Sequence, residues 1–311
     1  ALCSHCYEYH YTSCEHCGRL IECDSANYDE DDDFPYCDEC YRELQESAIK
    51  PYNYKPEPTF YGSGDLFYGI ELEVDKGGER NDYAEAILNV ANKDNNYLYA
   101  KHDGSIDDGF EIVSHPMTLE YHTNIMNWSD VMEMALSLGY RSHQTYTCGL
   151  HIHVNRNAFG KDYDTQEDAI SRIVHFVEMH WNELLKFSRR TEANMNRWAS
   201  RYGIANTAKD TYKNAKTKHC GRYVAVNLEN YATIEFRLFR GTLKYKTFLA
   251  TLQLVDEICN LALKLSDKEL ESMSWSDFVG QIDSGKSELI EYLKAKRLYV
   301  NEPVEIETEV E

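Results

Sequence analysis

The sequence has no long hydrophobic run, few basic residues and no glycine-rich phosphate loop. No apolar segment approaches the roughly 20 residues that span a bilayer, and no signal-peptide pattern opens the chain, so we expect a cytoplasmic protein without a membrane span. The 32 Lys and Arg face 53 Asp and Glu, for a formal net charge of −21. This deficit argues against binding to duplex nucleic acid, because phosphate contacts need a basic surface.

Cysteine is scarce over most of the chain. Seven of the ten cysteines fall within residues 1–40, and the other three are Cys148, Cys220 and Cys259. Paired cysteines in a chain without a secretion signal favour metal binding over disulfides. The 311 residues, 42% apolar and with 24 Tyr, are enough for one sizeable domain and a small appendage, which excludes global disorder.

The composition divides the chain into four parts. We expect a metal-binding module over 1–49, a linker over 50–64, a main domain over 65–301 and an acidic tail over 302–311. The linker contains three prolines and two glycines, which discourage regular structure. In the main domain, strands are predicted at 66–75, 97–102, 110–115, 149–154, 222–228 and 233–239, and helices at 81–92, 119–138, 165–187 and 248–265. The absence of a strict βαβ alternation predicts an α+β domain with a largely antiparallel sheet.

Two CxxC pairs in the first module predict a zinc site. Cys14 and Cys17, followed by Gly18, and Cys37 and Cys40 offer four thiolates at the spacing of a zinc-ribbon or LIM-like module. A second zinc would take Cys3, Cys6 and Cys23 with one histidine, for which His10 is the least cramped choice. One or two zinc ions are therefore expected, and sequential and cross-braced pairing both stay open. The acidic charge of this module favours a structural role or docking to a protein partner over binding to nucleic acid.

Three distant segments carry polar pairs with one apolar residue between them: Glu71 and Glu73, His151 and His153, and Glu235 and Arg237. Side chains alternate faces along a strand, so each pair projects from one face. Taken alone, Glu71 and Glu73 could be a solvated strand face, His151 and His153 could be core histidines, and Glu235 and Arg237 could be an ion pair on one face. Together they predict a sheet face that holds Mg²⁺ or Mn²⁺ and a polyanion, because hard carboxylate oxygens suit these ions.

A basic stretch interrupts the acidic chain. Residues 186–222 contain ten Lys and Arg against two Asp and Glu. Such a surplus predicts either a site for phosphates or an acidic substrate, or a solvated helical face. Both interpretations stay open.

Four motifs in order carry a family resemblance: YGIELEV, HDGSIDDGFEIVSHPM, CGLHIHV and TIEFRLFRGT. Over residues 66–245 the chain resembles the amidoligase family of the carboxylate–amine ligase superfamily, which includes glutamine synthetase and glutamate–cysteine ligase. Similar chains often carry an N-terminal zinc-binding module. The resemblance implies a curved antiparallel sheet, a glutamine synthetase-like half-barrel, that holds ATP and two or three Mg²⁺ or Mn²⁺ ions on its concave face.

The resemblance also implies roles for single residues. The expected ligands of the catalytic metals are Glu71, Glu73, Glu111, His151 and Glu235. Arg237 would meet the transferred phosphate, His153 and Arg240 would act beside it, and Asp103, Ser105 and Arg222 would line the site. The glutamine synthetase pattern has more glutamates around its metals than this sequence offers, and Asp103 is a candidate substitute, so the third metal stays open.

These expectations point to an ATP-dependent carboxylate–amine ligase. It would form an amide or isopeptide bond through an acyl phosphate, with a small-molecule or peptide carboxylate and an amine as substrates. Since no Walker-type loop is present, metal ions would hold the nucleotide. Two alternatives are a guanidino-type kinase on the same fold and an inactive zinc-dependent adaptor protein. The sequence does not identify the substrates.

Overall fold

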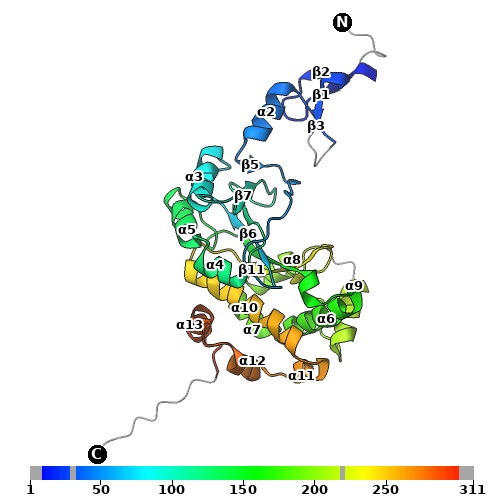
Figure 1. Cartoon of the computed structure of the whole chain (residues 1–311), viewed down its shortest axis with the longest axis vertical. Coiled ribbons are helices and arrows are strands. Elements are labelled where there is room, and N and C mark those ends of the chain that lie inside the picture. Colours follow the sequence, from blue (N-terminus) through cyan, green and yellow to red (C-terminus); the bar gives the residue numbers. More distant parts are fainter. Residues whose placement is uncertain (1–8, 29–32, 218–220, 301–311) are drawn as a thin grey trace, which may run out of the picture.

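The computed structural model describes residues 9–28, 33–217 and 221–300. In Figure 1 a small N-terminal region lies at one end of the molecule, and the helices α11, α12 and α13 lie toward the other. Cys3, Cys6 and the acidic tail predicted at 302–311 are outside the described residues.

The main domain is built on one open sheet of seven strands. Their order is β10-β11-β9-β6-β8-β7-β5, and all neighbours are antiparallel except the parallel pair β7 and β5. This confirms an α+β fold with a largely antiparallel sheet. The strands are β5 (Ile49–Lys50), β6 (Tyr68–Val74), β7 (Leu98–Lys101), β8 (Phe110–Ser114), β9 (Gly149–Asn155), β10 (Val226–Asn227) and β11 (Thr233–Arg240).

Helices cover the apolar face of this sheet. The long helix α10 (Tyr245–Lys264) is buried along most of its length, and side chains of β6 such as Ile70 and Leu72 are fully buried in the same core. The other helices of the domain are α3 (Asn81–Ala91), α4 (Leu119–Asn124), α5 (Trp128–Ser137), α6 (Tyr163–Met179), α7 (Trp181–Ser188), α8 (Glu192–Trp198), α9 (Ala208–Thr217), α11 (Asp267–Glu271), α12 (Trp275–Gln281) and α13 (Ser287–Ala295), with a 3-10 turn η2 (Arg156–Phe159). One face of the sheet is therefore left for polar groups.

Several predicted elements differ from the observed ones. The helix predicted at 119–138 is two helices, α4 and α5, because His122 and Trp128 pack across the break with the Trp128 indole N–H 3.1 Å from His122 Nδ1. The helix predicted at 165–187 divides at His180 into α6 and α7. The strand predicted at 222–228 is only the two residues of β10, and the edge strand β5 was not predicted.

The N-terminal region consists of short elements around the cysteines. They are β1 (Tyr11–Ser13), β2 (Leu20–Glu22), the 3-10 turn η1 (Cys23–Ser25), β3 (Asn27–Tyr28), β4 (Pro35–Tyr36) and α2 (Asp38–Glu46). Cys14, Cys37 and Cys40 are buried together with Tyr36, a core too small to be stable without a further link such as a metal.

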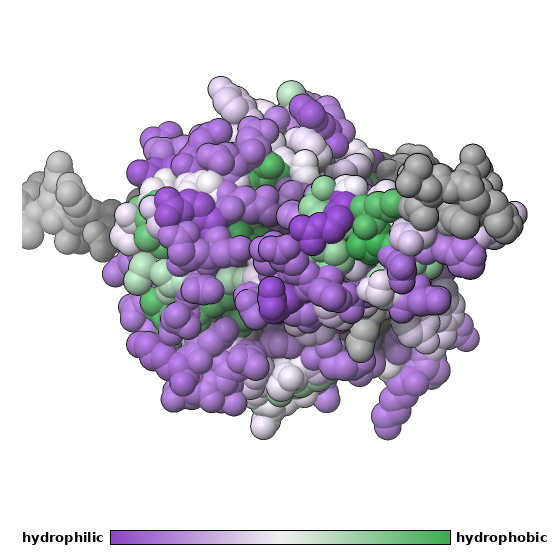
Figure 2. Space-filling view, turned by 90° about the horizontal axis from the view of Figure 1, so that it is seen from above, coloured by the Kyte–Doolittle hydropathy of each residue, from purple (hydrophilic) through white to green (hydrophobic). Residues whose placement is uncertain are grey.

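Polar residues dominate the surface in view from above. Figure 2 shows a mainly hydrophilic face, with hydrophobic residues gathered in small patches. None of the helices in the described part of the chain is long and apolar enough to cross a bilayer.

Candidate active site

Strand alternation and register bring the three polar pairs together. On the antiparallel strands β6 and β9, Glu71 lies opposite His151, and on β9 and β11, His153 lies opposite Glu235. On the other side of β6, Glu73 lies opposite Glu111 of β8. Six side chains expected to act together therefore come from four adjacent strands, on the sheet face opposite the helical core.

The two histidines lie between the carboxylates. His151 Nδ1 is 3.2 Å from Glu71 Oε2, and its Nε2 is 3.6 Å from Glu73 Oε1. His153 Nε2 is 3.2 Å from Glu71 Oε1, while its Nδ1 is 3.1 Å from the Thr233 hydroxyl. Glu71 therefore contacts both histidines of the His-x-His segment.

These side chains form three overlapping groups that could each hold a metal ion. The ligand atoms of each group lie within 4.8 Å of one another, and the groups are Glu71 with His153 and Glu235, Glu71 with Glu111 and His151, and Glu73 with Asp103 and Glu111. Carboxylates with at most one imidazole suit Mg²⁺ or Mn²⁺. The structure thus places His153 among potential metal ligands, whereas the sequence put it beside the phosphate, and it brings Asp103 into a third group.

The charge of the carboxylates also fits a bound cation. Burial, and secondarily the neighbouring Glu71, raise the pKa of Glu111 to about 10, even though Lys101 Nζ is 3.6 Å from its carboxylate. Burial likewise raises the pKa of Glu73. Buried carboxylates that cannot all be charged at once are stabilised in the charged form by a divalent cation. The residues present therefore fit the metal ions that the resemblance implies.

Gly149 leaves room for two side chains of the site. Its N–H donates to Glu73 Oε2 at 2.5 Å. A Cβ at this position would lie 2.5 Å from His151 Nε2 and 2.9 Å from Arg190 Nη2, which is closer than real Cβ contacts allow. Sequence analysis missed both Gly149 and Arg190 as site residues, because the only local signals were a glycine at the start of a predicted strand and one arginine among ten basic residues.

The three arginines named from the sequence lie in different surroundings. Arg237 is paired with Glu235 and lies over the Tyr223 ring, with its Cζ 5.8 Å from the ring centroid. Arg222 donates to the hydroxyl groups of Tyr52 and Tyr223. Arg240 is separated from them by a bulge in β11 and donates to the Thr145 carbonyl at 3.1 Å. The described residues that line the site include Arg237 and Arg222, but not Arg240.

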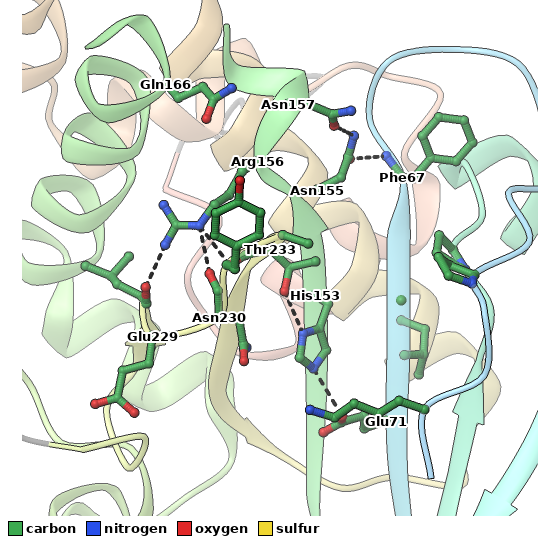
Figure 3. Close-up of a pocket in the computed structure, with 18 of the residues that line it drawn as sticks. Phe67, Glu71, His153, Asn155, Arg156, Asn157, Gln166, Glu229, Asn230 and Thr233 are labelled. Atoms are coloured by element: carbon green, nitrogen blue, oxygen red, sulfur yellow. Dashed lines mark hydrogen bonds and ion pairs between the residues drawn. The ribbon is translucent and has the colours of Figure 1, made fainter. Parts of the chain in front are cut away.

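Two neighbouring cavities share Glu71 and His153 of these groups. The smaller, of about 270 Å³, is lined by all three metal groups, which include Asp103, and by Ser105 and Arg222. The larger, of about 1110 Å³, is lined by aromatic and polar side chains from β6, β9, η2, α6 and the segment before β6. Both are lined by Lys55, Glu71, His153, Glu229 and Asn230. Figure 3 shows Glu71 and His153 at one end of the larger cavity and Asn155, Arg156 and Gln166 further along it.

The cysteines of the N-terminal region form a separate group. Ligand atoms of Cys14, Cys17, Cys37 and Cys40 lie within 4.8 Å of one another, so these four could hold a zinc ion. Cys23 and His10 do not join any such group among the described residues, and their predicted partners Cys3 and Cys6 lie outside them. The second zinc stays a prediction.

A comparison with known protein families agrees with the sequence motifs. A family described as "Putative amidoligase enzyme" matches residues 90–259, which is more than half of the chain and includes Glu111, His151 and Glu235. Among solved structures, that of a bifunctional glutathione synthetase from Pasteurella multocida is similar, with a TM-score of 0.36 and 13% identity over 76% of this chain. The match covers 45% of the glutathione synthetase chain. No curated protein matches the present chain. On the family match, the chain belongs to the amidoligase family.

Proposed function

We propose that the chain is an ATP-dependent carboxylate–amine ligase that forms an amide or isopeptide bond. The observation that carries this proposal is the position of the three potential metal groups in the smaller cavity, two of which contain Glu71, a residue that also lines the larger cavity. One cavity can then hold a nucleotide and the other an acceptor, with the transferred phosphoryl group between them. The family match and the open antiparallel sheet support this reading, and the glutamine synthetase-like half-barrel is the fold that we propose for it.

The larger cavity suits the nucleotide. Its volume of about 1110 Å³ is at the upper end of ligand pockets, and Phe67, Tyr163 and Tyr231 give it aromatic surface. The Arg156 guanidinium donates to the carbonyls of Leu228, Asn230 and Thr233, at 2.7, 3.0 and 3.1 Å. Because Arg156 fixes this loop, the wall of the cavity next to His153 is held in place before a ligand binds.

The acids and histidines of the smaller cavity would hold the metal ions. When bound, Mg²⁺ or Mn²⁺ would neutralise the phosphate charges of ATP, which a site without a Walker loop cannot do with backbone N–H groups. Glu71 belongs to two of the three groups and Glu111 to two, so these residues would link neighbouring ions. Zinc at Cys14, Cys17, Cys37 and Cys40 would be structural, since four thiolates leave no open position.

Amide formation by such a ligase takes two steps: transfer of a phosphoryl group to the carboxylate, and then attack by the amine. An oxygen of the acceptor carboxylate attacks the γ-phosphorus of ATP, ADP leaves, and an acyl phosphate forms. The amine nitrogen then attacks the acyl carbon, phosphate leaves and the nitrogen loses a proton. Arg237 lines the smaller cavity beside Glu235, and in this proposal it would stabilise the negative charge of the phosphoryl oxygens.

A single assay tests this function. The full chain is incubated with ATP, Mg²⁺ and a mixture of carboxylates and amines, while phosphate release and product masses are followed. We expect phosphate release that needs both a carboxylate and an amine, with a product lighter than its two substrates by one water. A phosphorylated guanidine compound would instead identify a kinase, and the absence of both nucleotide binding and turnover would identify an adaptor protein.

A further inference from the structure

The basic stretch 186–222 contributes three residues to the smaller cavity. They are Arg190, Trp198 and Arg222. Elsewhere in the stretch the cations pair on the surface, for example Lys216 with Glu167 at 2.7 Å and Lys209 with Asp168 at 3.1 Å. Arg190 and Arg222 thus differ from these lysines, because each of the lysines is paired with a carboxylate.

Arg190 is a buried cation without an acidic partner. It follows α7, is only 7% exposed, and its Nη2 donates to the Phe239 carbonyl at 3.2 Å. Its Nε is buried without a hydrogen-bond partner, and it forms no ion pair with any carboxylate of the described residues. Burial lowers the pKa of Arg190 to about 10, although the charge of Glu73 opposes this. A buried charge without a partner is costly, and an anion bound in the cavity would remove that cost.

Arg222 is a second unpaired cation of the same cavity, and it is exposed. Its guanidinium lies 5.8 Å from the Tyr52 ring centroid and 5.2 Å from that of Tyr223, and it donates to both hydroxyl groups. Neutral hydroxyl groups hold the guanidinium in place without cancelling its charge. In the described part of the chain it has no carboxylate partner, so it is also available to an anion.

We propose that the smaller cavity binds an acceptor with two negative groups. The reacting carboxylate would bind to Arg190, and the second negative group to Arg222 at the exposed end of the cavity. This rests on the proposed ligase function, which places a carboxylate in this cavity. A volume of about 270 Å³ is that of roughly nine water molecules. It can accommodate the acidic end of an acceptor, and that acceptor is either a free dicarboxylate or a peptide that ends in glutamate.

Calorimetric titration of the full chain, with Mg²⁺ and a non-hydrolysable ATP analogue, tests this inference. The acids compared are glutarate, pentanoate and the peptide acetyl-Ala-Ala-Glu. Glutarate and pentanoate both have five carbon atoms, but glutarate has two carboxylates and pentanoate has one. We expect glutarate or the peptide to bind at least tenfold more tightly than pentanoate, and the tighter of the two identifies the source of the acidic end.

Variants then assign the two arginines. Arg222→Ala should weaken the dianion about tenfold and leave pentanoate unchanged, whereas Arg190→Ala should weaken all the acids at least tenfold and Arg190→Lys should restore part of the affinity. Lys213→Ala removes an exposed cation of the same stretch that lines neither cavity, so it should change nothing. If circular dichroism shows that Arg190→Ala does not fold, the affinities of Arg190→Lys and Arg222→Ala for the same acids decide whether the two arginines bind the acceptor.

Two outcomes would overturn the inference in distinguishable ways. Equal affinity for glutarate, the peptide and pentanoate, or a preference that survives Arg222→Ala, contradicts the two-anion site while leaving the ligase function standing. Failure of the ATP analogue to bind before any acid is added contradicts the ligase function itself, and the inference with it.

Discussion

At the scale of single residues, Gly149 controls the space around His151 and Arg190. We expect Gly149→Ala to displace the His151 ring, because its Cβ would lie 2.5 Å from Nε2, and so to weaken Mn²⁺ binding by about tenfold. Gly69→Ala is the matched control on the adjacent strand, where the Cβ would meet His153 Cβ at an ordinary 3.5 Å. Titration of Mn²⁺ followed by electron paramagnetic resonance measures both. Equal affinities in the two variants would contradict the steric argument.

Arg237 is the residue whose removal most directly tests the phosphate role. Its partners are the buried Glu235 carboxylate and the Tyr223 ring, on the polar face of the sheet and not in the apolar core. We expect Arg237→Ala to lower turnover by roughly 10²–10³, because charge on the transferred phosphoryl group loses a stabilising cation. The thermal unfolding transition should stay nearly unchanged. A variant that turns over ATP with carboxylate and amine at the normal rate would remove Arg237 from the mechanism.

At the scale of elements, His122 joins α4 to the sheet. Its Nε2 donates to the Tyr68 carbonyl at 2.9 Å, and its Nδ1 accepts from Trp128 at 3.1 Å, so the ring must be neutral. Burial, only partly offset by the hydrogen bond to Tyr68, lowers the pKa of His122 to about 4. An unfolded chain, with an ordinary histidine pKa of ~6.5, binds this proton more readily.

The depressed pKa of His122 therefore predicts a loss of stability in acid. Its contribution is fully present above about pH 6.5 and is lost as the pH falls toward 4, which amounts to about 2 kcal/mol of unfolding free energy between pH 7 and 4.5. Urea unfolding at the two pH values should show a smaller pH dependence for His122→Gln than for the wild type, by about this amount. The same pH dependence in both proteins would contradict the argument.

At the scale of the whole molecule, the zinc group holds together a region with almost no apolar core. We expect metal analysis to find at least one zinc per chain, and one fewer after Cys14→Ser with Cys17→Ser, since these residues supply two of the four thiolates. The main domain, with its own core, should keep its thermal transition. A purified wild-type chain without zinc would refute the metal assignment.

Strand pairs and cysteine pairs could be predicted because their signals are local. Glu71 and Glu73 occupy alternate positions of strand β6, and His151 and His153 occupy alternate positions of strand β9. The two cysteines of each CxxC pair lie within one turn of the chain. Two other features could not be predicted: the break between α4 and α5, and the shortness of strand β10. Contacts with distant residues decide such features, as the contact of His122 with the Tyr68 carbonyl shows. Local patterns therefore predict which residues share a face, but they do not predict where an element stops.

The sequence by itself determined the α+β class, the polar face of the sheet, the cysteine pairs and the family resemblance, because strand period and motif spacing are properties of neighbouring residues. Only the tertiary structure decided which groups meet. Register placed His153 opposite Glu235, Arg240 came to lie opposite Gly149 and outside the lining of both cavities, and Gly149 made room for Arg190, 41 residues further along the chain. The physical reason is that packing and register act between segments far apart in the sequence, where no local pattern records the distance between their side chains.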